Sequence, residues 1–513
     1  MSEEVPDVRA PTPLDRLTTW LGPPRPYQLT RWLLLRLLGV VYVFAFIGLI
    51  KQGPALLGSD GLTPVHSYLH QLHASGQGFW DIPSVLWWGS SDGALAAWSW
   101  VGLVLSIALV LGYANSISLV LLWVIYGSFV RVGQIWFAFG WEIQILETTL
   151  LAAVLAHPWD PRPLAAPPPS PIAIVLLRWM VFRIYLGAGL IKLRGADCWT
   201  QLTCLDYHFE TQPIPNPLSA VFHHLPHAVL ATGVMLNHIV EVGLPWFVFG
   251  PRRIRLVAGC LMLSFQVILV LSGNLAFLNW LTIVPVIACL DDDFLRLFIP
   301  QRLRDRLPPV PASHPSRVRP WILGAICTVV AVASIPVIEN LASKHQAMNR
   351  SYDRLDLVNT YGAFGSVGET RHELVIEGTR DADPATATWK PYELPCKPGD
   401  LARRPCVLGP YHRRLDWLIW FAAMNEQPRD PWVIHFVYKL LTGDATIRTQ
   451  LASDPFDGAA PTFVRIRRFT YHLQPLSADT WWTRDNEQLW LEPVSLQTPG
   501  LGEALERFGW SAE

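Results

Sequence analysis

The chain has 513 residues, of which 51% are hydrophobic and only 16% are charged, and its formal net charge is −1. Soluble proteins carry about 25% charged residues. This composition, with a mean hydropathy of +0.27, therefore excludes an ordinary soluble domain and predicts a polytopic membrane protein. The near-zero net charge gives no support to nucleic acid as a partner. The first 30 residues contain no signal-peptide core, so the first apolar segment is expected to be an uncleaved anchor.

Nine apolar segments are candidates for membrane-spanning helices, because a helix needs about 20 apolar residues to cross a bilayer. They are 32–50, 94–112, 116–132, 140–156, 171–191, 229–249, 255–272, 275–290 and 320–338. Longer apolar runs are divided at Arg131–Gln134 and at Ser272–Asn274. We therefore predict a polytopic α-helical domain over residues 32–339, with about nine transmembrane helices.

The distribution of Lys and Arg among the loops predicts the orientation, because cytoplasmic loops are enriched in these residues. The N-terminal segment 1–31 carries Arg9, Arg16, Arg25 and Arg31 and is predicted to be cytoplasmic. With nine spans, the loop 192–228 and the C-terminal region 340–513 then lie outside, in the periplasm or in the lumen of the endoplasmic reticulum.

The C-terminal region 340–513 differs in pattern from the rest of the chain. Alternating apolar and polar residues predict strands at His372–Gly378 and Thr462–Tyr471. Aromatic-rich stretches at Leu415–Met424 and Trp432–Thr442 predict two short helices. We expect one β-rich extracytoplasmic domain of ordinary size.

Four of the seven cysteines form two closely spaced pairs, Cys198 with Cys204 and Cys396 with Cys406. Both pairs lie in regions predicted to be outside, where an oxidising compartment favours disulfides over free thiols. The other cysteines lie in apolar segments, where a thiol acts as a small hydrophobic group.

Charged residues occur inside the apolar segments, where they usually mark a site or a buried partner. Glu142 and Glu147 are five residues apart, about 140° around a helix, and so lie on different faces. Glu142 is expected near the outer interface, within reach of water. Glu147 is deeper and needs a partner, for which Arg178, Arg183 and Lys192 are the candidates. A structural ion pair that fixes the helix register is the favoured role.

A second polar group comprises Asn237, His238 and Glu241. Asn237 and Glu241 are four residues apart on one helical face, and His238 and Glu241 are three apart. A histidine beside a carboxylate can act as an acid–base pair. It can equally join helices by hydrogen bonds, and we favour this structural role.

The sequence predicts neither a metal nor another cofactor. The outside loop contains several potential ligands, but they lack the spacing of a helical zinc motif; these residues are Asp206, His208, Glu210, His223, His224 and His227. No nucleophile elbow, P-loop or dinucleotide fingerprint occurs in a suitable context.

The whole chain resembles the lipase maturation factor family. The most specific block is RIYLGAGLIKLRGADCWTQLTCLDYHFETQPIPNPLS at residues 183–219, followed by NHIVEVGLPWFVFGPRRIRLVAG from Asn237. The C-terminal region contributes NTYGAFGSVGETRHELVIEGT from Asn359. The membrane part is also similar to that of the vitamin K-dependent gamma-carboxylase group. A composition rich in Ala, Arg and Pro predicts a bacterial member of the family.

The resemblance implies assistance to protein folding rather than catalysis. Animal members are membrane proteins of the endoplasmic reticulum that are needed for the folding and assembly of secreted dimeric lipases. The expected partners are therefore an exported, lipase-like client and membrane lipids. For a bacterial member the location would be the inner membrane. The chain ends without the tetrapeptide that retrieves proteins to the endoplasmic reticulum.

Two hypotheses follow, and they use different residues. A maturation factor would bind its client through the outside loop and the C-terminal domain. Aromatic side chains in the C-terminal domain could form that surface. We expect most of them to form the domain core instead. The candidates are Trp389, Tyr392, Tyr411 and Trp417. The alternative is a membrane-embedded acid–base enzyme acting on a lipid or quinone-like substrate. Its working groups would converge on a cavity; the candidates are Lys192, His238, Glu142 and Glu241.

Overall fold

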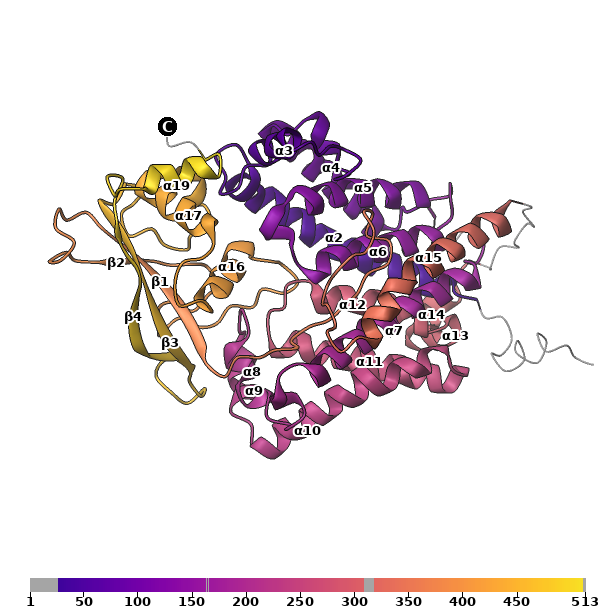
Figure 1. The fold of residues 1–513 in the computed structure, drawn as a ribbon. Coiled ribbons are helices and arrows are strands. Elements are labelled where there is room, and N and C mark those ends of the chain that lie inside the picture. Colours follow the sequence, from indigo (N-terminus) through magenta and orange to yellow (C-terminus); the bar gives the residue numbers. More distant parts are fainter. Residues whose placement is uncertain (1–25, 163, 165, 309–317, 511–513) are drawn as a thin grey trace, which may run out of the picture.

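The computed structural model of the chain describes residues 26–162, 164, 166–308 and 318–510. A helical region is followed in the chain by a mixed region that contains a small sheet, at the left of Figure 1. Most of the predicted cytoplasmic segment, including Arg9, Arg16 and Arg25, lies outside the described residues, as do the last three residues of the chain.

All nine predicted apolar segments are helical. The corresponding elements are α2 (Gln28–Leu57), α4 (Asp92–Leu111), α5 (Ser116–Val132), α6 (Gly140–Leu155), α7 (Pro171–Arg194), α10 (His227–His238) with η4 (Ile239–Gly243) and η5 (Leu244–Phe249), α11 (Arg252–Ser272), α12 (Leu278–Val286) with η6 (Ile287–Cys289), and α15 (Arg319–Ala342). Shorter helices connect them: α3 (Val65–Ala74), η1 (Val85–Trp88), η2 (Gln134–Phe137), η3 (Asp197–Trp199), α8 (Leu205–Thr211), α9 (Pro217–His223), α13 (Asp292–Leu295), η7 (Arg296–Phe298) and α14 (Gln301–Arg304).

Six helices of the described chain are long and apolar enough to cross a membrane, so the predicted count of nine is not confirmed. The six are Gln28–Leu57, Asp92–Leu111, Pro171–Arg194, His227–Phe249, Arg252–Ser272 and Arg319–Ala342. The other three segments fall short in length: α5 has 17 residues, α6 has 16, and Leu278–Cys289 is shorter still. At 1.5 Å per residue such helices do not reach across a hydrocarbon core of about 30 Å.

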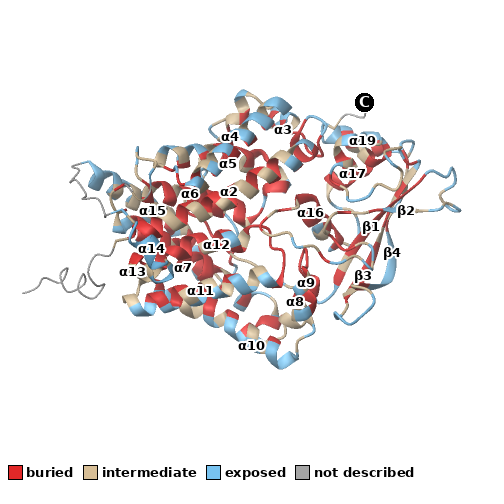
Figure 2. Ribbon diagram, turned by 180° about the vertical axis from the view of Figure 1, so that it is seen from behind, coloured by how far each residue is buried: buried red, intermediate tan, exposed pale blue. Residues whose placement is uncertain are grey.

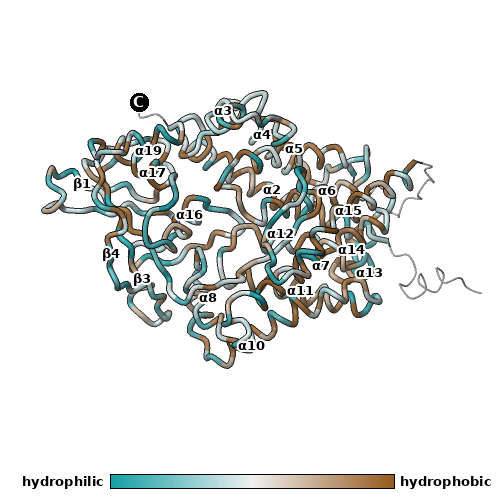
Figure 3. Tube along the Cα trace, viewed as in Figure 1, coloured by the Kyte–Doolittle hydropathy of each residue, from teal (hydrophilic) through white to brown (hydrophobic). Residues whose placement is uncertain are grey.

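The six long helices differ in how much of their surface the protein covers. In α7, 78% of the most apolar stretch is buried, whereas in α15 only 11% is buried. Figure 2 shows that buried residues, in red, are concentrated in the middle of the helical region. Figure 3 shows the hydrophobic residues, in brown, along these same helices. α7 is therefore a central helix, and α15 presents its apolar side chains to the surroundings.

The C-terminal region combines one sheet with short helices. Its antiparallel sheet has the order β2-β1-β3-β4, formed by β1 (Arg371–Thr379), β2 (Lys390–Tyr392), β3 (Phe463–Leu473) and β4 (Trp482–Val494). The two predicted helices are confirmed as α16 (Arg414–Ala423) and α17 (Pro431–Leu441), and α18 (Ala445–Arg448) and α19 (Leu501–Arg507) follow. Both predicted strands are also confirmed, as β1 and β3.

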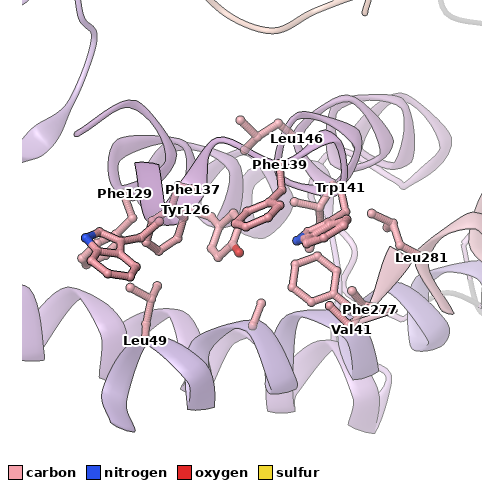
Figure 4. Packing of buried hydrophobic residues seen from close by; sticks show 14 of the residues in the cluster. Val41, Leu49, Tyr126, Phe129, Phe137, Phe139, Trp141, Leu146, Phe277 and Leu281 are labelled. Atoms are coloured by element: carbon pink, nitrogen blue, oxygen red, sulfur yellow. The ribbon is translucent and has the colours of Figure 1, made fainter. Parts of the chain in front are cut away.

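The helical and C-terminal regions share one hydrophobic core. Phe139 and Trp141 lie at the start of α6, and the close view of Figure 4 shows them near Phe277. Their rings also contact Trp417 of α16, with centroid distances of 5.8 and 5.1 Å. Edge-to-face pairs at such distances add to the stabilisation that burial provides. The C-terminal region is thus packed directly against the ends of the membrane helices.

Candidate functional site

Lys192, near the end of α7, forms a buried ion pair with Glu241 of η4, the turn that follows α10. Lys192 Nζ donates to both carboxylate oxygens of Glu241, at 2.7 and 2.6 Å, and Asn237 Nδ2 donates to Glu241 Oε2 at 3.0 Å. Glu241 lies in the π-helical turn η4, a local widening that is frequent at functional sites. Gly189 permits the approach, because a Cβ there would lie 3.0 Å from the Glu241 backbone carbon.

A cavity of about 700 Å³ lies beside this ion pair. Its walls come from α7, α8, α10, α11 and α12, together with Phe364 of the C-terminal region, and most lining side chains are apolar. The polar lining residues include Lys192, His208, Asn237, Glu241 and Gln266. A mostly apolar pocket of this volume with a few polar groups has the usual character of a small-molecule site.

His238 does not pair with Glu241. Its Nε2 donates to the backbone carbonyl oxygen of Trp199 at 3.0 Å, and its ring lies 6.2 Å from the indole. His238 therefore ties α10 to the loop that follows α7, and it is absent from the cavity lining. Of the four acid–base candidates, only Lys192 and Glu241 meet at the cavity.

The deep carboxylate Glu147 pairs with Arg183, one of its three predicted partners. Both side chains are 1% exposed. The C-terminal region completes the site: Tyr361 Oη donates to Glu147 Oε2 at 2.7 Å, and the backbone N–H of Asn359 donates to it at 3.0 Å. Arg183 in turn donates to the Asn359 carbonyl at 2.7 Å. The cluster joins two regions of the chain.

Glu142 is fully buried, so the expectation that it reaches water is wrong. Its Oε1 is 2.8 Å from Arg414 Nη1, and Tyr126 Oη donates to its Oε2 at 2.5 Å. Arg414 belongs to α16 and also lies over the ring of Phe137 at 3.6 Å. Packing of α16 against the start of α6 removes Glu142 from solvent and provides its counter-ion. The second intramembrane carboxylate thus also binds the C-terminal region.

Arg178 of α7, the third predicted partner of Glu147, forms no ion pair with a carboxylate among the described residues. It donates to the Ala288 carbonyl oxygen and to Tyr27 Oη, each at 2.9 Å. Carbonyl groups near the end of a helix lack intrahelical donors, so Arg178 satisfies one of them at η6. Its role is local and structural.

Both predicted disulfides are present, between Cys198 and Cys204 and between Cys396 and Cys406. The first lies in the loop directly after α7. The Trp199 indole in this loop donates to the Phe364 carbonyl oxygen at 2.8 Å. The second loop is held by Asn274, whose Nδ2 donates to the Cys406 carbonyl at 2.8 Å. Each disulfide loop therefore contacts the other region of the chain.

His208 lies on α8, within the segment 192–228. Its side chain is buried, and its ring lies 4.9 Å from that of Phe364 in an edge-to-face arrangement. Burial, with a smaller contribution from the Lys192 charge, lowers the pKa of His208 to about 4. The imidazole is therefore neutral at physiological pH.

Two family models cover most of the chain. The lipase maturation factor transmembrane domain matches residues 29–297, and the lipase maturation factor C-terminal domain matches residues 357–491. The chain belongs to the lipase maturation factor family. Lys192, Asn237 and Glu241 lie in the first matched segment, and the partners of Glu142 and Glu147 from the C-terminal region lie in the second.

Individual members of the lipase maturation factor family are similar over nearly the whole chain. Lipase maturation factor 1 of Bos taurus is 42% identical, over 92% of this chain and 90% of its own length. The Homo sapiens protein of the same name is 39% identical, over 92% and 88%. Lipase maturation factor 2 of Xenopus laevis is 27% identical, over 94% and 85%. These relatives are vertebrate and give no support to the predicted bacterial origin. No solved structure matches the chain.

Sequence reasoning missed the residues that complete these sites from a distance. Asn359, Tyr361 and Arg414 are more than 200 positions away from the carboxylates that they contact. Gln266 occurs in an apolar segment with no charged neighbour that would mark it. A polar side chain inside an apolar segment was the available signal, since such residues seldom face lipid.

Proposed function

We propose that the chain is an integral membrane maturation factor that assists the folding and assembly of an exported, lipase-like client. The observation that carries the proposal is the 39–42% identity to lipase maturation factor 1 proteins over 92% of the chain. The similarity includes both the membrane region and the C-terminal region. A factor that binds the folded form of a client favours that form by mass action.

The two disulfides support an oxidising location for the outside loop and the C-terminal region, because such bonds are rare in the cytosol. We place these parts in the lumen of the endoplasmic reticulum, or in the periplasm for a bacterial host, with the N-terminus cytoplasmic. The domain limits 32–339 and 340–513 belong to the same proposal.

The client would contact the outer surface of the loop 192–228 and of the C-terminal region. Among the four aromatic candidates for that surface, Tyr392 and Trp417 are buried and belong to the core. Trp389 is half-buried beneath Arg465, whose guanidinium lies 4.2 Å from the ring centre. Tyr411 is half-buried too, so aromatic exposure is limited, and backbone and polar groups would carry much of the contact.

An acid–base enzyme is the second candidate, because Lys192 and Glu241 lie beside a cavity. A desolvated lysine can serve as a base. Its ammonium group is nevertheless held by both oxygens of Glu241, and Glu142 and His238 lie elsewhere. The maturation role therefore has the stronger support.

The test is rescue of secreted lipase activity. The full chain is expressed in cells that lack their own lipase maturation factor and produce a secreted lipase, and activity per unit of secreted lipase protein is measured. We expect the wild-type chain to restore activity and to co-purify with the intracellular lipase. Normal amounts of correctly located protein with neither rescue nor co-purification would refute the proposal.

The Lys192→Met variant separates the two candidates in the same assay. If proton transfer at Lys192 carries the function, rescue falls at least a hundredfold while the variant accumulates normally. A maturation factor that acts by binding retains co-purification, and its rescue falls only in proportion to the amount of folded protein.

A further inference from the structure

We propose that the cavity beside Lys192 binds a neutral lipid with one acyl chain and a hydroxyl-bearing head group, of the monoacylglycerol class. The inference rests on the shape of the cavity, on two buried polar atoms without partners in its wall and on the charge balance of its polar end. It does not depend on the client of the protein.

Apolar side chains of the two helices α10 and α11 form the open side of the cavity. Val229 and Leu236 of α10 and Ile268 of α11 line it and are 50%, 51% and 51% exposed. Both helices are long and apolar enough to span a membrane, so these side chains face acyl chains rather than water. A lipid can therefore enter from the bilayer without crossing an aqueous phase.

Gln266 provides an acceptor that nothing in the described protein satisfies. Tyr185 Oη donates to the Met262 carbonyl at 3.1 Å, so it can only accept from Gln266, whose Nε2 lies 3.0 Å away. This arrangement fixes the orientation of the amide group. Gln266 Oε1 is left without a partner, although the residue is buried and only 5% exposed. Buried acceptors of this kind are rare, and a hydroxyl group of a ligand would satisfy it.

His208 provides a second polar atom in the same wall. Its side chain is 7% exposed, and its Nδ1 has no hydrogen-bond partner in the described chain. A neutral imidazole offers one donor and one acceptor. A head group with two hydroxyls can therefore bond to His208 and Gln266 together.

The polar end of the cavity is electrically balanced, which favours a neutral head group. Lys192 is the only Lys or Arg among the described residues that line the cavity, and its ammonium group donates to both oxygens of Glu241. An anionic phosphate would face the Glu241 carboxylate without a free cation. Burial of such a charge without a counter-ion is strongly unfavourable.

The volume limits the size of the ligand. Pockets of about 300–1,000 Å³ enclose a single drug-sized molecule, and this one has about 700 Å³. One acyl chain with a small head group is of that size. A two-chain phospholipid would leave its second chain outside the cavity.

The experiment is photolabelling of the full-length protein in phosphatidylcholine nanodiscs. The probe is a monoacylglycerol with a diazirine in its acyl chain, and labelled peptides are identified by mass spectrometry. We expect labels on the segments 228–237 and 265–275, and competition by unlabelled monoacylglycerol. The methyl ester of the same acid lacks both hydroxyls and therefore both hydrogen bonds, so it should compete about tenfold less well or worse.

Three variants make the result specific. Thr232→Trp narrows the cavity from an exposed lining position and should abolish labelling. Met235→Trp is the matched control, because Met235 is 49% exposed on the same helix and does not line the cavity. Gln266→Leu should remove the preference for monoacylglycerol over the methyl ester. Gel filtration and thermal unfolding identify variants that fail to fold.

Several outcomes would overturn the proposal. Equal labelling of the Thr232→Trp and Met235→Trp proteins would show that the probe samples only the outer surface. Stronger competition by phosphatidylglycerol than by monoacylglycerol would show that the head group is anionic. Crosslinking of a client segment to residues 228–237, with lipid excluded, would assign the cavity to protein binding.

Discussion

Two buried ion pairs on α7 have the same chemistry and different surroundings. Arg183 and Glu147 are enclosed by Tyr361 and Asn359, whose hydroxyl and backbone N–H groups donate to Glu147 Oε2. The pair of Lys192 with Glu241 lies beside a cavity whose wall contains polar atoms without partners. The first pair is enclosed by protein groups, and the second has a ligand-sized space next to it.

The comparison shows that the C-terminal region decides which charged group becomes structural. It contributes Tyr361 and Asn359 to Glu147, and Arg414 to Glu142. At the Lys192 site it contributes only Ala363 and Phe364 to the cavity lining. Where polar groups of the C-terminal region are present, the site is filled, and where only an apolar wall is present, space remains. Variants at the two pairs should therefore behave differently.

The largest effect is expected at the filled pair. Glu147→Gln leaves the Arg183 guanidinium buried without its counter-ion, and breaking such a pair costs about 4 kcal/mol of unfolding free energy. We expect a strong fall in thermal stability in detergent and little folded protein in cells. The double variant Glu147→Gln with Arg183→Met removes both charges and should recover part of the loss. A single variant as stable as the wild type would show that the pair does not join the two regions.

A smaller effect is expected at the pair beside the cavity. Lys192→Met leaves Glu241 with the Asn237 hydrogen bond and with a space that water can enter. The loss should be about 2 kcal/mol, the contribution of hydrogen bonds to a charged group, measured by the same thermal unfolding. If Lys192→Met lost as much unfolding free energy as Glu147→Gln, the two sites would exclude water equally, and the cavity would not distinguish them.

The sequence predicted the elements whose signals are local. Hydrophobic runs located all nine apolar helices, alternation located β1 and β3, and spacing identified both disulfides. It also gave Arg183 as a possible partner of Glu147, because both residues lie within apolar segments. Such signals depend on neighbours in the chain and need no knowledge of the tertiary packing.

The contacts that complete the sites could not be predicted in this way. Arg414 reaches Glu142 only because α16 packs against the start of α6, and nothing near either residue in the sequence indicates it. The cavity depends on how five helices fit together. The widened turn at Glu241 precedes Pro245, yet the sequence is equally compatible with one continuous helix over 229–249. The predicted number of spans is not confirmed because three of the nine apolar helices are short: α5 has 17 residues, α6 has 16, and Leu278–Cys289 has fewer.

The smallest effect concerns pH and tests whether His208 is buried as the structure shows. Its pKa is about 4 in the folded protein and about 6.5 when exposed. Between these values the unfolded chain binds the additional proton, so stability falls as the pH is lowered from 6.5 to 4. From pH 7 to pH 5 this residue should lower the unfolding free energy by about 2 kcal/mol.

The matched variant is His208→Gln, which keeps a polar group but cannot titrate. In denaturant titrations, the unfolding free energy of this variant should fall by about 2 kcal/mol less between pH 7 and pH 5 than that of the wild type. Other buried histidines contribute equally to both proteins and cancel in the difference. Parallel curves for the two proteins would mean that the His208 ring reaches water, and the polar end of the cavity would then be open to solvent, in contrast to the enclosed Glu147 pair.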